Sequence, residues 1–198
     1  ICMRIQYLAQ DWPEIQFAAK EAARVMQAPT VGGWQALKRI GRFLIGAPRL
    51  VVEYVRQAER KVIEVYTDAD FAGCRLTRKS TSSCCVMIGS YWIRSSSTTQ
   101  GFQALSTGES EFHVLVKGGS IGLGMQSLAE DMGEKLEVLL KCDATAGKGI
   151  AERRGVGRVR HLHTPLLWLQ RAIHRKSLRV AKIPGSENMC DIGTKHVE

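Results

Sequence analysis

The order of strand-like and helix-like segments is the feature that most constrains the fold of this chain. Three strand-like segments come first, and strands and helices then alternate. The predicted strands cover residues 61–67, 84–89, 91–96, 136–142 and 178–183, and the predicted helices cover about 107–128, 145–153, 164–174 and a short stretch after 187. This βββαβαβα order predicts an α/β domain with a three-stranded meander and a buried parallel fourth strand.

A helical hairpin is predicted in front of this core. Its first helix begins at Asp11-Trp12-Pro13, with Asp11 as the cap, and extends to Gln27. Its second helix runs from Val31 to Ile45 and ends before Gly46 and Pro48. One face of the second helix is an apolar stripe of Trp34, Leu37, Ile40 and Leu44. Its outer face is basic and carries Lys38, Arg39 and Arg42. Whether that basic face is solvated or contacts nucleic acid stays open. We place the boundary so that residues 1–55 form the hairpin segment and 56–198 the core domain.

The overall charge points to a polyanionic partner. The formal net charge is +9 and the pI is about 9.5, which favours nucleic acid first and an anionic membrane second. A basic protein with no such partner is the alternative. The apolar runs are too short to span a bilayer, and no signal peptide opens the chain. None of the six cysteines forms a CxxC pair, so we expect reduced thiols in an intracellular protein rather than a zinc site.

Four acidic residues lie where strands end or helices begin. Asp68 follows the first strand, Asp143 follows the fourth, Glu111 lies in the first turns of the long helix, and Asp191 lies in the last segment. If the first and fourth strands are parallel neighbours, Asp68 and Asp143 leave the same end of the sheet. Clustered carboxylates repel one another unless a cation is present, and Mg²⁺ prefers hard oxygen ligands. The pattern therefore predicts a metal site, and two such ions can promote phosphodiester hydrolysis.

The same residues fall in motifs that resemble the ribonuclease H domain of copia-type retrotransposon polyproteins. The resemblance runs in order over nearly the whole chain and includes the hairpin, which resembles the segment that joins reverse transcriptase to ribonuclease H. The matching segments are 11–15, 34–40, 66–74, 78–82, 104–112, 142–146, 160–161 and 188–195.

The resemblance implies a mixed five-stranded sheet flanked by helices. It implies endonucleolytic cleavage of the RNA strand of RNA–DNA hybrids, leaving a 3′-hydroxyl and a 5′-phosphate. The implied cofactor is a pair of Mg²⁺ ions, with Mn²⁺ as a substitute, bound by Asp68, Glu111, Asp143 and Asp191. The implied partners are an RNA–DNA hybrid and the reverse transcriptase portion of the same polyprotein.

Two neighbouring acids compete for these roles. Spacing alone does not choose between Asp68 and Asp70, because both project from one face of a strand. Glu109 and Glu111 are two residues apart and do not share a helix face. The motifs select Asp68, which follows an aromatic residue and a threonine, and Glu111, which precedes an aromatic residue.

The chain also departs from the motifs. His163 stands where relatives often carry an acid, and Ala144 stands where they carry an asparagine, so one supporting hydrogen bond is expected to be missing. No histidine lies between Ile183 and Cys190, just before the last acid. Proton transfer to the leaving group, if it is needed, is therefore assigned to water, His161, His163 or His196.

A basic loop is the candidate for substrate binding. Arg153, Arg154, Arg158 and Arg160 crowd one loop and, with His161, are predicted to hold hybrid phosphates. A solvated loop and a structural His161 are the alternatives. The hybrid itself would be recognised by its minor-groove width and 2′-hydroxyls.

Two other functions compete with an active ribonuclease H. One is a catalytically silent module of the same fold that binds nucleic acid or acts as a scaffold, against which the intact set of four acids argues. The other is an exonuclease or transposase-like enzyme, against which the hairpin argues.

Overall fold

The computed structural model describes residues 1–157, 162 and 164–195. Helices α1 (Cys2–Leu8), α2 (Pro13–Arg24) and α3 (Val31–Gly46) precede an α/β core. The core contains β1 (Val62–Asp70), β2 (Thr81–Ile88), β3 (Tyr91–Thr99), α4 (Thr107–Asp131), β4 (Glu137–Cys142), α5 (Thr145–Glu152), α6 (Trp168–His174) and β5 (Arg179–Lys182). Short 3₁₀ turns are η1 (Thr164–Leu167), η2 (Gly185–Glu187) and η3 (Met189–Gly193). The predicted element order is confirmed.

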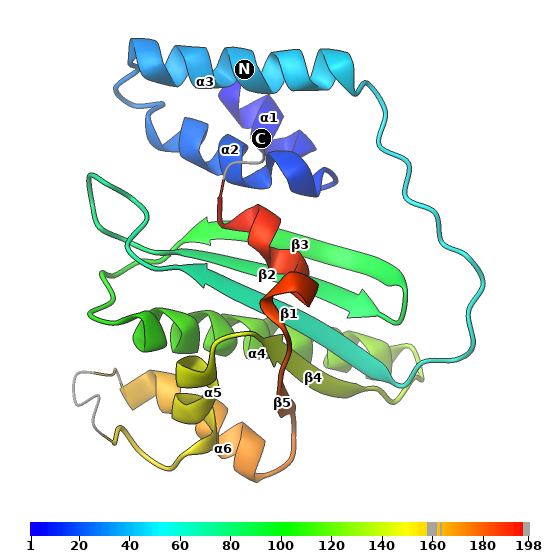
Figure 1. Cartoon of the computed structure of the whole chain (residues 1–198). Helices are drawn as coiled ribbons and strands as arrows, with labels where there is room; N and C mark the ends of the chain where they lie inside the picture. Colours follow the sequence, from blue (N-terminus) through cyan, green and yellow to red (C-terminus); the bar gives the residue numbers. More distant parts are fainter. Residues whose placement is uncertain (158–161, 163, 196–198) are drawn as a thin grey trace.

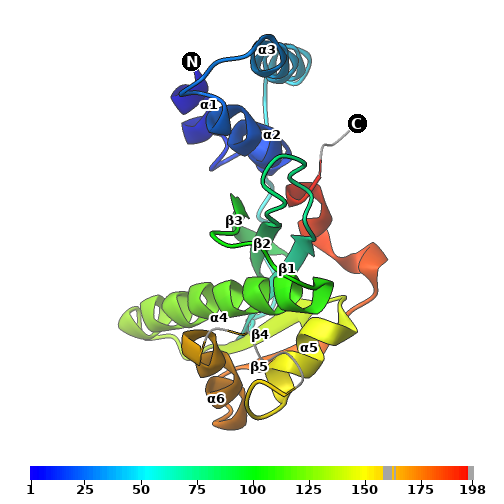
Figure 2. The same ribbon diagram turned by 90° about the vertical axis from the view of Figure 1, so that its left-hand side faces the viewer.

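The strands form one mixed sheet in the order β3-β2-β1-β4-β5. Strands β1, β2 and β3 form an antiparallel meander, whereas β1, β4 and β5 run parallel. Helices α4, α5 and α6 lie on one side of the sheet, and the hairpin lies on the other (Figures 1 and 2). The meander and the parallel fourth strand therefore agree with the sequence prediction.

Two apolar cores follow from this layering. The larger one lies between the sheet and its helices, where Ile63, Phe112, Leu115, Leu140 and Leu169 are fully buried. The smaller one lies within the hairpin, and α3 contributes its apolar stripe there: Ile40 is buried, Leu37 and Leu44 are partly buried, and Trp34 remains half exposed. An exposed strap, residues 47–61, connects the hairpin to β1 and carries no regular secondary structure.

Three details at the start of the chain differ from the sequence prediction. The predicted cap at Asp11 is wrong: Pro13 occupies the first helical turn, so the capping position belongs to Trp12, and no side chain caps α2. Helix α2 ends at Arg24 rather than Gln27, because the backbone at Val25 already leaves helical geometry. Helix α1 was not predicted, since its seven residues are too few to show a periodic pattern.

Helix α4 contains glycines because it lies directly on the sheet. A Cβ atom on Gly118 would lie 2.6 Å from Thr67 Cγ2, and one on Gly122 would lie 2.6 Å from Val138 Cγ1. The glycines lower intrinsic helix propensity, as the sequence predicts, yet they permit the close approach. That approach lets the N-terminal turns of α4 reach the carboxyl ends of β1 and β4.

Neither a membrane span nor a disulfide appears in the described part of the chain. None of its helices is both long and apolar enough to cross a bilayer. All six cysteines are free thiols, and all but Cys74 are buried, which agrees with the predicted reduced state.

Candidate active site

Strand register brings Asp68 and Asp143 together. The last pair in the parallel β1–β4 ladder is Tyr66 with Lys141, and each acid lies two residues beyond its member of that pair. The two carboxylates therefore leave neighbouring parallel strands at the same level and at the same edge of the sheet.

Glu111 enters the same space from the second turn of α4. One carboxylate oxygen from each of Asp68, Glu111 and Asp143 lies within 4.8 Å of the other two. Glu111 is 5% exposed, and among the described residues its Oε2 atom is buried with no hydrogen-bond partner. A buried carboxylate oxygen without a partner is costly unless something absent from the polypeptide neutralises it.

The electrostatics of the cluster are unfavourable without a cation. Burial, together with the negative charges of Asp68 and Asp143, raises the pKa of Glu111 to about 8. Burial also raises the pKa of Asp68, against the hydrogen bond from Thr194, and the charges of Asp143 and Asp191 add to that increase. The donor set is all carboxylate oxygen, which is the ligand type that Mg²⁺ and Mn²⁺ prefer. The residues present therefore fit a hard divalent cation.

Asp191 lies beside this group but is not part of the close set of three. It is exposed on η3, forms an ion pair with Lys195, and lines a hollow together with Asp68. The segment that carries it is fixed to β1 by Asn188, whose Nδ2 atom donates to the Thr67 carbonyl oxygen at 3.0 Å. Asp191 therefore lies on the side of the site where Asp68 lies, and the two residues line the same hollow.

The sequence did not identify Thr194 and Asn188 as residues that position the site. Thr194 Oγ1 donates to Asp68 Oδ2 at 2.6 Å, and Asn188 is buried against β1. Both lie in the segment 188–195 that carries the family motif, so the motif marked the region without assigning these two side chains a role.

Glu109 and Asp70, the two alternative acids, make contacts that differ from those of Glu111 and Asp68. Glu109 Oε2 accepts a hydrogen bond from the Leu105 backbone at 2.7 Å, and the Glu109 backbone donates to Ser106 Oγ. Glu109 therefore helps to cap α4. Asp70 lies on the same strand face as Asp68 but packs against the turn at Gly73. Among the described residues, neither belongs to the carboxylate group that could hold an ion.

Known proteins resemble this chain in sequence over most of its length. No protein-family model matches the chain. The chain is 27% identical over 194 residues to the retrovirus-related Pol polyprotein from transposon RE1 of Arabidopsis thaliana, covering 96% of this chain and 13% of that protein. It is also 27% identical over 187 residues to the Pol polyprotein from transposon TNT 1-94 of Nicotiana tabacum, covering 93% and 14% respectively.

This chain is a homologue of the retrovirus-related Pol polyproteins of plant transposons. It spans only about an eighth of the length of these relatives. Its fold is a mixed five-stranded sheet flanked by helices, as the sequence resemblance implied. Among solved structures, ribonuclease H1 from Halobacterium salinarum aligns with a TM-score of 0.39 at 14% identity, covering 65% of this chain and 90% of that one.

Two of the five residues predicted to bind substrate in the basic loop, Arg153 and Arg154, belong to the described part of the chain. Arg158, Arg160 and His161, as well as the other candidate proton carriers His163 and His196, lie outside the described residues. The Arg153 guanidinium folds back and donates to the Val156 carbonyl oxygen, so this side chain braces its own loop.

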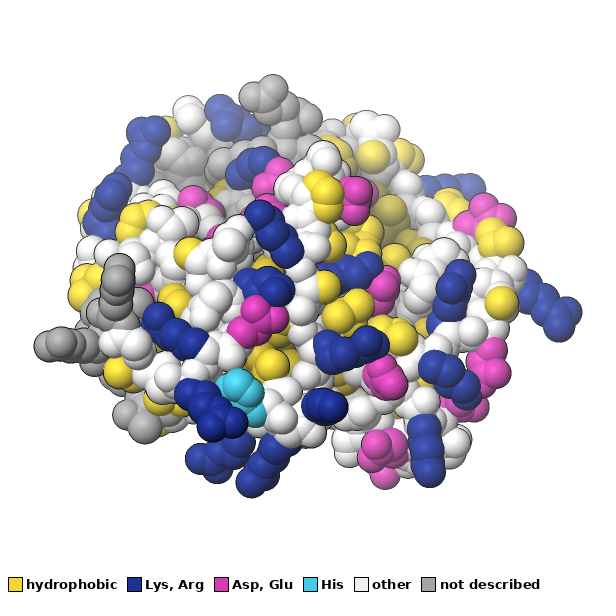
Figure 3. Space-filling model, turned by 60° about the horizontal axis from the view of Figure 1, so that its bottom comes forward, with side chains coloured by type: hydrophobic (Ala, Val, Ile, Leu, Met, Phe, Trp, Pro, Cys, Tyr) yellow, Lys and Arg dark blue, Asp and Glu magenta, His cyan; other side chains and the backbone are white. Residues whose placement is uncertain are grey.

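Arg154 instead joins a basic hollow that the sequence did not predict. A space of about 410 Å³ between the end of α5 and α6 is lined by Arg154, Arg171, His174 and Arg175. Figure 3 views the face that carries these helices and shows Lys and Arg side chains spread over it, with Asp and Glu between them. The spacing of these residues in the sequence, across two separate elements, gave no sign of this grouping.

Proposed function

We propose that this chain hydrolyses the RNA strand of RNA–DNA hybrids, as part of retrotransposon reverse transcription inside the cell. The observation that carries the proposal is the convergence of Asp68, Glu111 and Asp143, with the buried Oε2 atom of Glu111 lacking a partner. Homology to Pol polyproteins supports the assignment to reverse transcription.

Asp68, Glu111, Asp143 and Asp191 would hold two Mg²⁺ or Mn²⁺ ions. When bound, the ions supply positive charge that activates a water and stabilises the leaving oxygen of the phosphodiester. Thr194 fixes the Asp68 carboxylate through its hydrogen bond. The sheet edge and α4 hold the other two carboxylates rigidly, so little reorganisation is needed when substrate arrives. The products would be a 3′-hydroxyl and a 5′-phosphate.

Substrate binding is assigned to the basic side chains after α5 and on α6. Arg154, together with Arg171 and Arg175, offers phosphate contacts that orient a hybrid without reading its sequence. Arg153, Arg158, Arg160 and His161 remain proposed contacts of the same loop. The reverse transcriptase portion of the polyprotein is the proposed protein partner, with residues 1–55 as the connecting segment and 56–198 as the ribonuclease H domain.

The test is cleavage of an end-labelled RNA–DNA hybrid with Mg²⁺. The unmodified protein should cut the RNA strand, whereas Asp143→Asn, which keeps shape and removes a ligand charge, should lower the rate at least a hundredfold. Asp131→Asn, at the exposed end of α4, is the matched control and should cut normally.

Two results would contradict the proposal. Binding of the hybrid without cleavage by the unmodified protein would favour a silent binding or scaffold module. Equal cleavage of single-stranded RNA or double-stranded DNA would refute the substrate assignment.

A further inference from the structure

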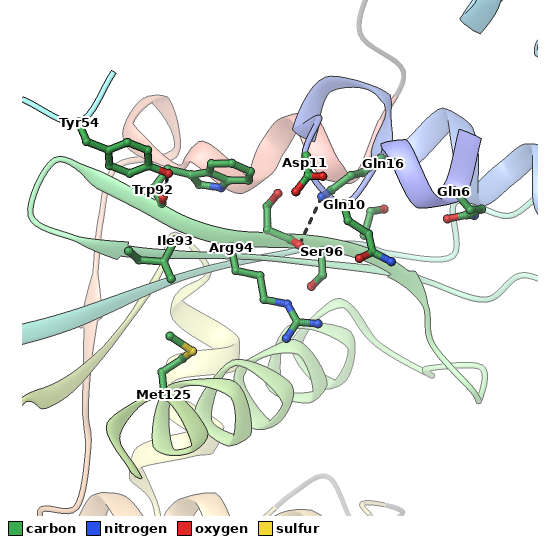
Figure 4. Close-up of a pocket in the computed structure, with 13 residues that line it drawn as sticks. Gln6, Gln10, Asp11, Gln16, Tyr54, Trp92, Ile93, Arg94, Ser96 and Met125 are labelled. Carbon is green, nitrogen blue, oxygen red and sulfur yellow. Dashed lines mark hydrogen bonds between the residues drawn. The ribbon is translucent and has the colours of Figure 1, made fainter. Parts of the chain in front are cut away.

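Helix α2 is fixed to the sheet by a polar stripe with helical spacing. Gln16, Lys20 and Arg24 are four residues apart and share one face of the helix. Gln16 Nε2 donates to the Ser95 carbonyl oxygen on β3 at 3.3 Å (Figure 4). Lys20, only 8% exposed, donates to Thr81 Oγ1 at 2.8 Å. Arg24 reaches the turn between β1 and β2. The hairpin therefore has a defined position on the core.

This position brings an aromatic ring of the hairpin to the acidic site. Phe17 lines the hollow of about 430 Å³ that also contains Asp68 and Asp191. Phe71, which is 39% exposed in the turn after β1, lines the same hollow. Lys20 Nζ lies 4.4 Å from the centroid of the Phe17 ring, so the residue that anchors α2 also supports the ring.

The chemistry of this hollow is unusual for a surface that meets only a duplex. A hybrid presents its sugar edges and 2′-hydroxyls in the minor groove, and a phenyl ring forms no hydrogen bond with them. Flat apolar rings instead suit the π-face of a base, and stacking of this kind tolerates any sequence. Bases inside a duplex are already stacked on their neighbours, so only an unpaired base has a free face.

We propose that Phe17 and Phe71 bind an unpaired base of the RNA strand next to the acidic site, so that the hairpin supplies part of the substrate-binding surface. This inference rests on the proposed function. It makes junctions between hybrid and single-stranded RNA the preferred substrates, and it makes Lys20 a positioning residue that holds Phe17 in place.

The experiment measures binding in EDTA, where no cleavage occurs. A blunt fluorescent RNA–DNA hybrid is compared with the same hybrid carrying a short RNA overhang at either end. The unmodified protein should bind an overhang hybrid about tenfold more tightly than the blunt one. Phe17→Ala and Phe17→Leu should each remove that difference, because both lose the ring and the second keeps apolar volume.

The control is Phe43→Ala, which removes an exposed aromatic ring from α3 and should keep the tenfold difference. Melting curves confirm that each variant is folded. Equal affinity of the unmodified protein for blunt and overhang hybrids would overturn the inference, as would a folded Phe17→Leu variant that keeps the preference. Cleavage of the blunt hybrid with Mg²⁺, measured on the same preparation, tests the proposed function separately.

Discussion

Thr194 Oγ1 donates a 2.6 Å hydrogen bond to Asp68 Oδ2, which links the last described turn of the chain to its first core strand. The same hydroxyl lies 3.0 Å from the carbonyl oxygen of Asp191. The orientation of the Asp68 carboxylate therefore depends on the segment that carries Asp191, and the two halves of the site are coupled through one side chain.

Removing this hydroxyl should weaken the site without removing a ligand. Thr194→Val keeps the shape of the side chain and should reduce Mg²⁺ affinity or the hybrid cleavage rate about tenfold, as expected for loss of a partner that orients a metal ligand. Thr194→Ser retains the hydroxyl and should stay close to the unmodified protein. Equal behaviour of the valine and serine variants would show that the hydrogen bond has no functional role.

Replacing Glu111 with glutamine should stabilise the metal-free protein at high pH. Because burial and neighbouring charges raise the pKa of Glu111 from 4.5 to about 8, the protonated side chain is favoured in the folded state. Its contribution to stability is complete below about pH 4.5 and is lost as pH rises through about 8. In EDTA, the melting temperature of Glu111→Gln should therefore exceed that of the unmodified protein at pH 9, with little difference at pH 5.

Magnesium should reverse that order. Cation binding to the folded state stabilises it by mass action, so the unmodified protein should gain more from added Mg²⁺ than the glutamine variant does. A glutamine variant that melts lower than the unmodified protein in EDTA at pH 9 would argue against an electrostatically strained cluster.

Two glycines on α4 provide a matched pair that tests the close packing of the helix on the sheet. Gly122→Ala places a Cβ atom 2.6 Å from Val138 Cγ1 and should destabilise the fold by ~1–3 kcal/mol. Gly124→Ala meets no atom within 4 Å and should stabilise it by ~0.5–1 kcal/mol through helix propensity. Chemical denaturation measures both, and shifts of the same sign would contradict the packing.

Cys74 should be the most reactive thiol at neutral pH. Burial alone would raise its pKa, but hydrogen bonds from Thr77 and Arg24 outweigh it and lower the pKa to about 6. Burial raises the pKa of Cys84 to about 12 and that of Cys142 to about 11. Brief treatment with iodoacetamide at pH 7, read by mass spectrometry, should label Cys74 first, and Arg24→Gln should slow that labelling. Faster labelling at Cys142 would refute this order.

The sequence predicted the core of the fold because its patterns are local. The apolar run before Asp143 and the alternating run before Asp68 each indicate a strand, and a parallel pair then places both acids at one edge. The family motifs selected Glu111 over Glu109, and in the structure Glu109 Oε2 accepts a hydrogen bond from the Leu105 backbone and helps to cap α4.

The features that the sequence did not predict depend on tertiary contacts, which no local sequence pattern encodes. Gln16 and Lys20 look like solvated positions on an isolated helix, but the sheet buries both. Arg154 belongs to a loop in the sequence, yet its neighbours in the basic hollow come from α6. The role of Thr194 requires knowing that η3 returns to β1, across more than a hundred residues.

Asp68, Glu111 and Asp143 are together expected to bind divalent cations. Crystals soaked in Mn²⁺ test this binding directly, because anomalous scattering locates the ion without assuming its ligands. We predict an anomalous peak within about 2.0–2.4 Å of carboxylate oxygens from these three residues, and no such peak in Asp143→Asn crystals. An unmodified protein that shows no peak at this site at millimolar Mn²⁺, or shows one only elsewhere on the surface, would contradict the account.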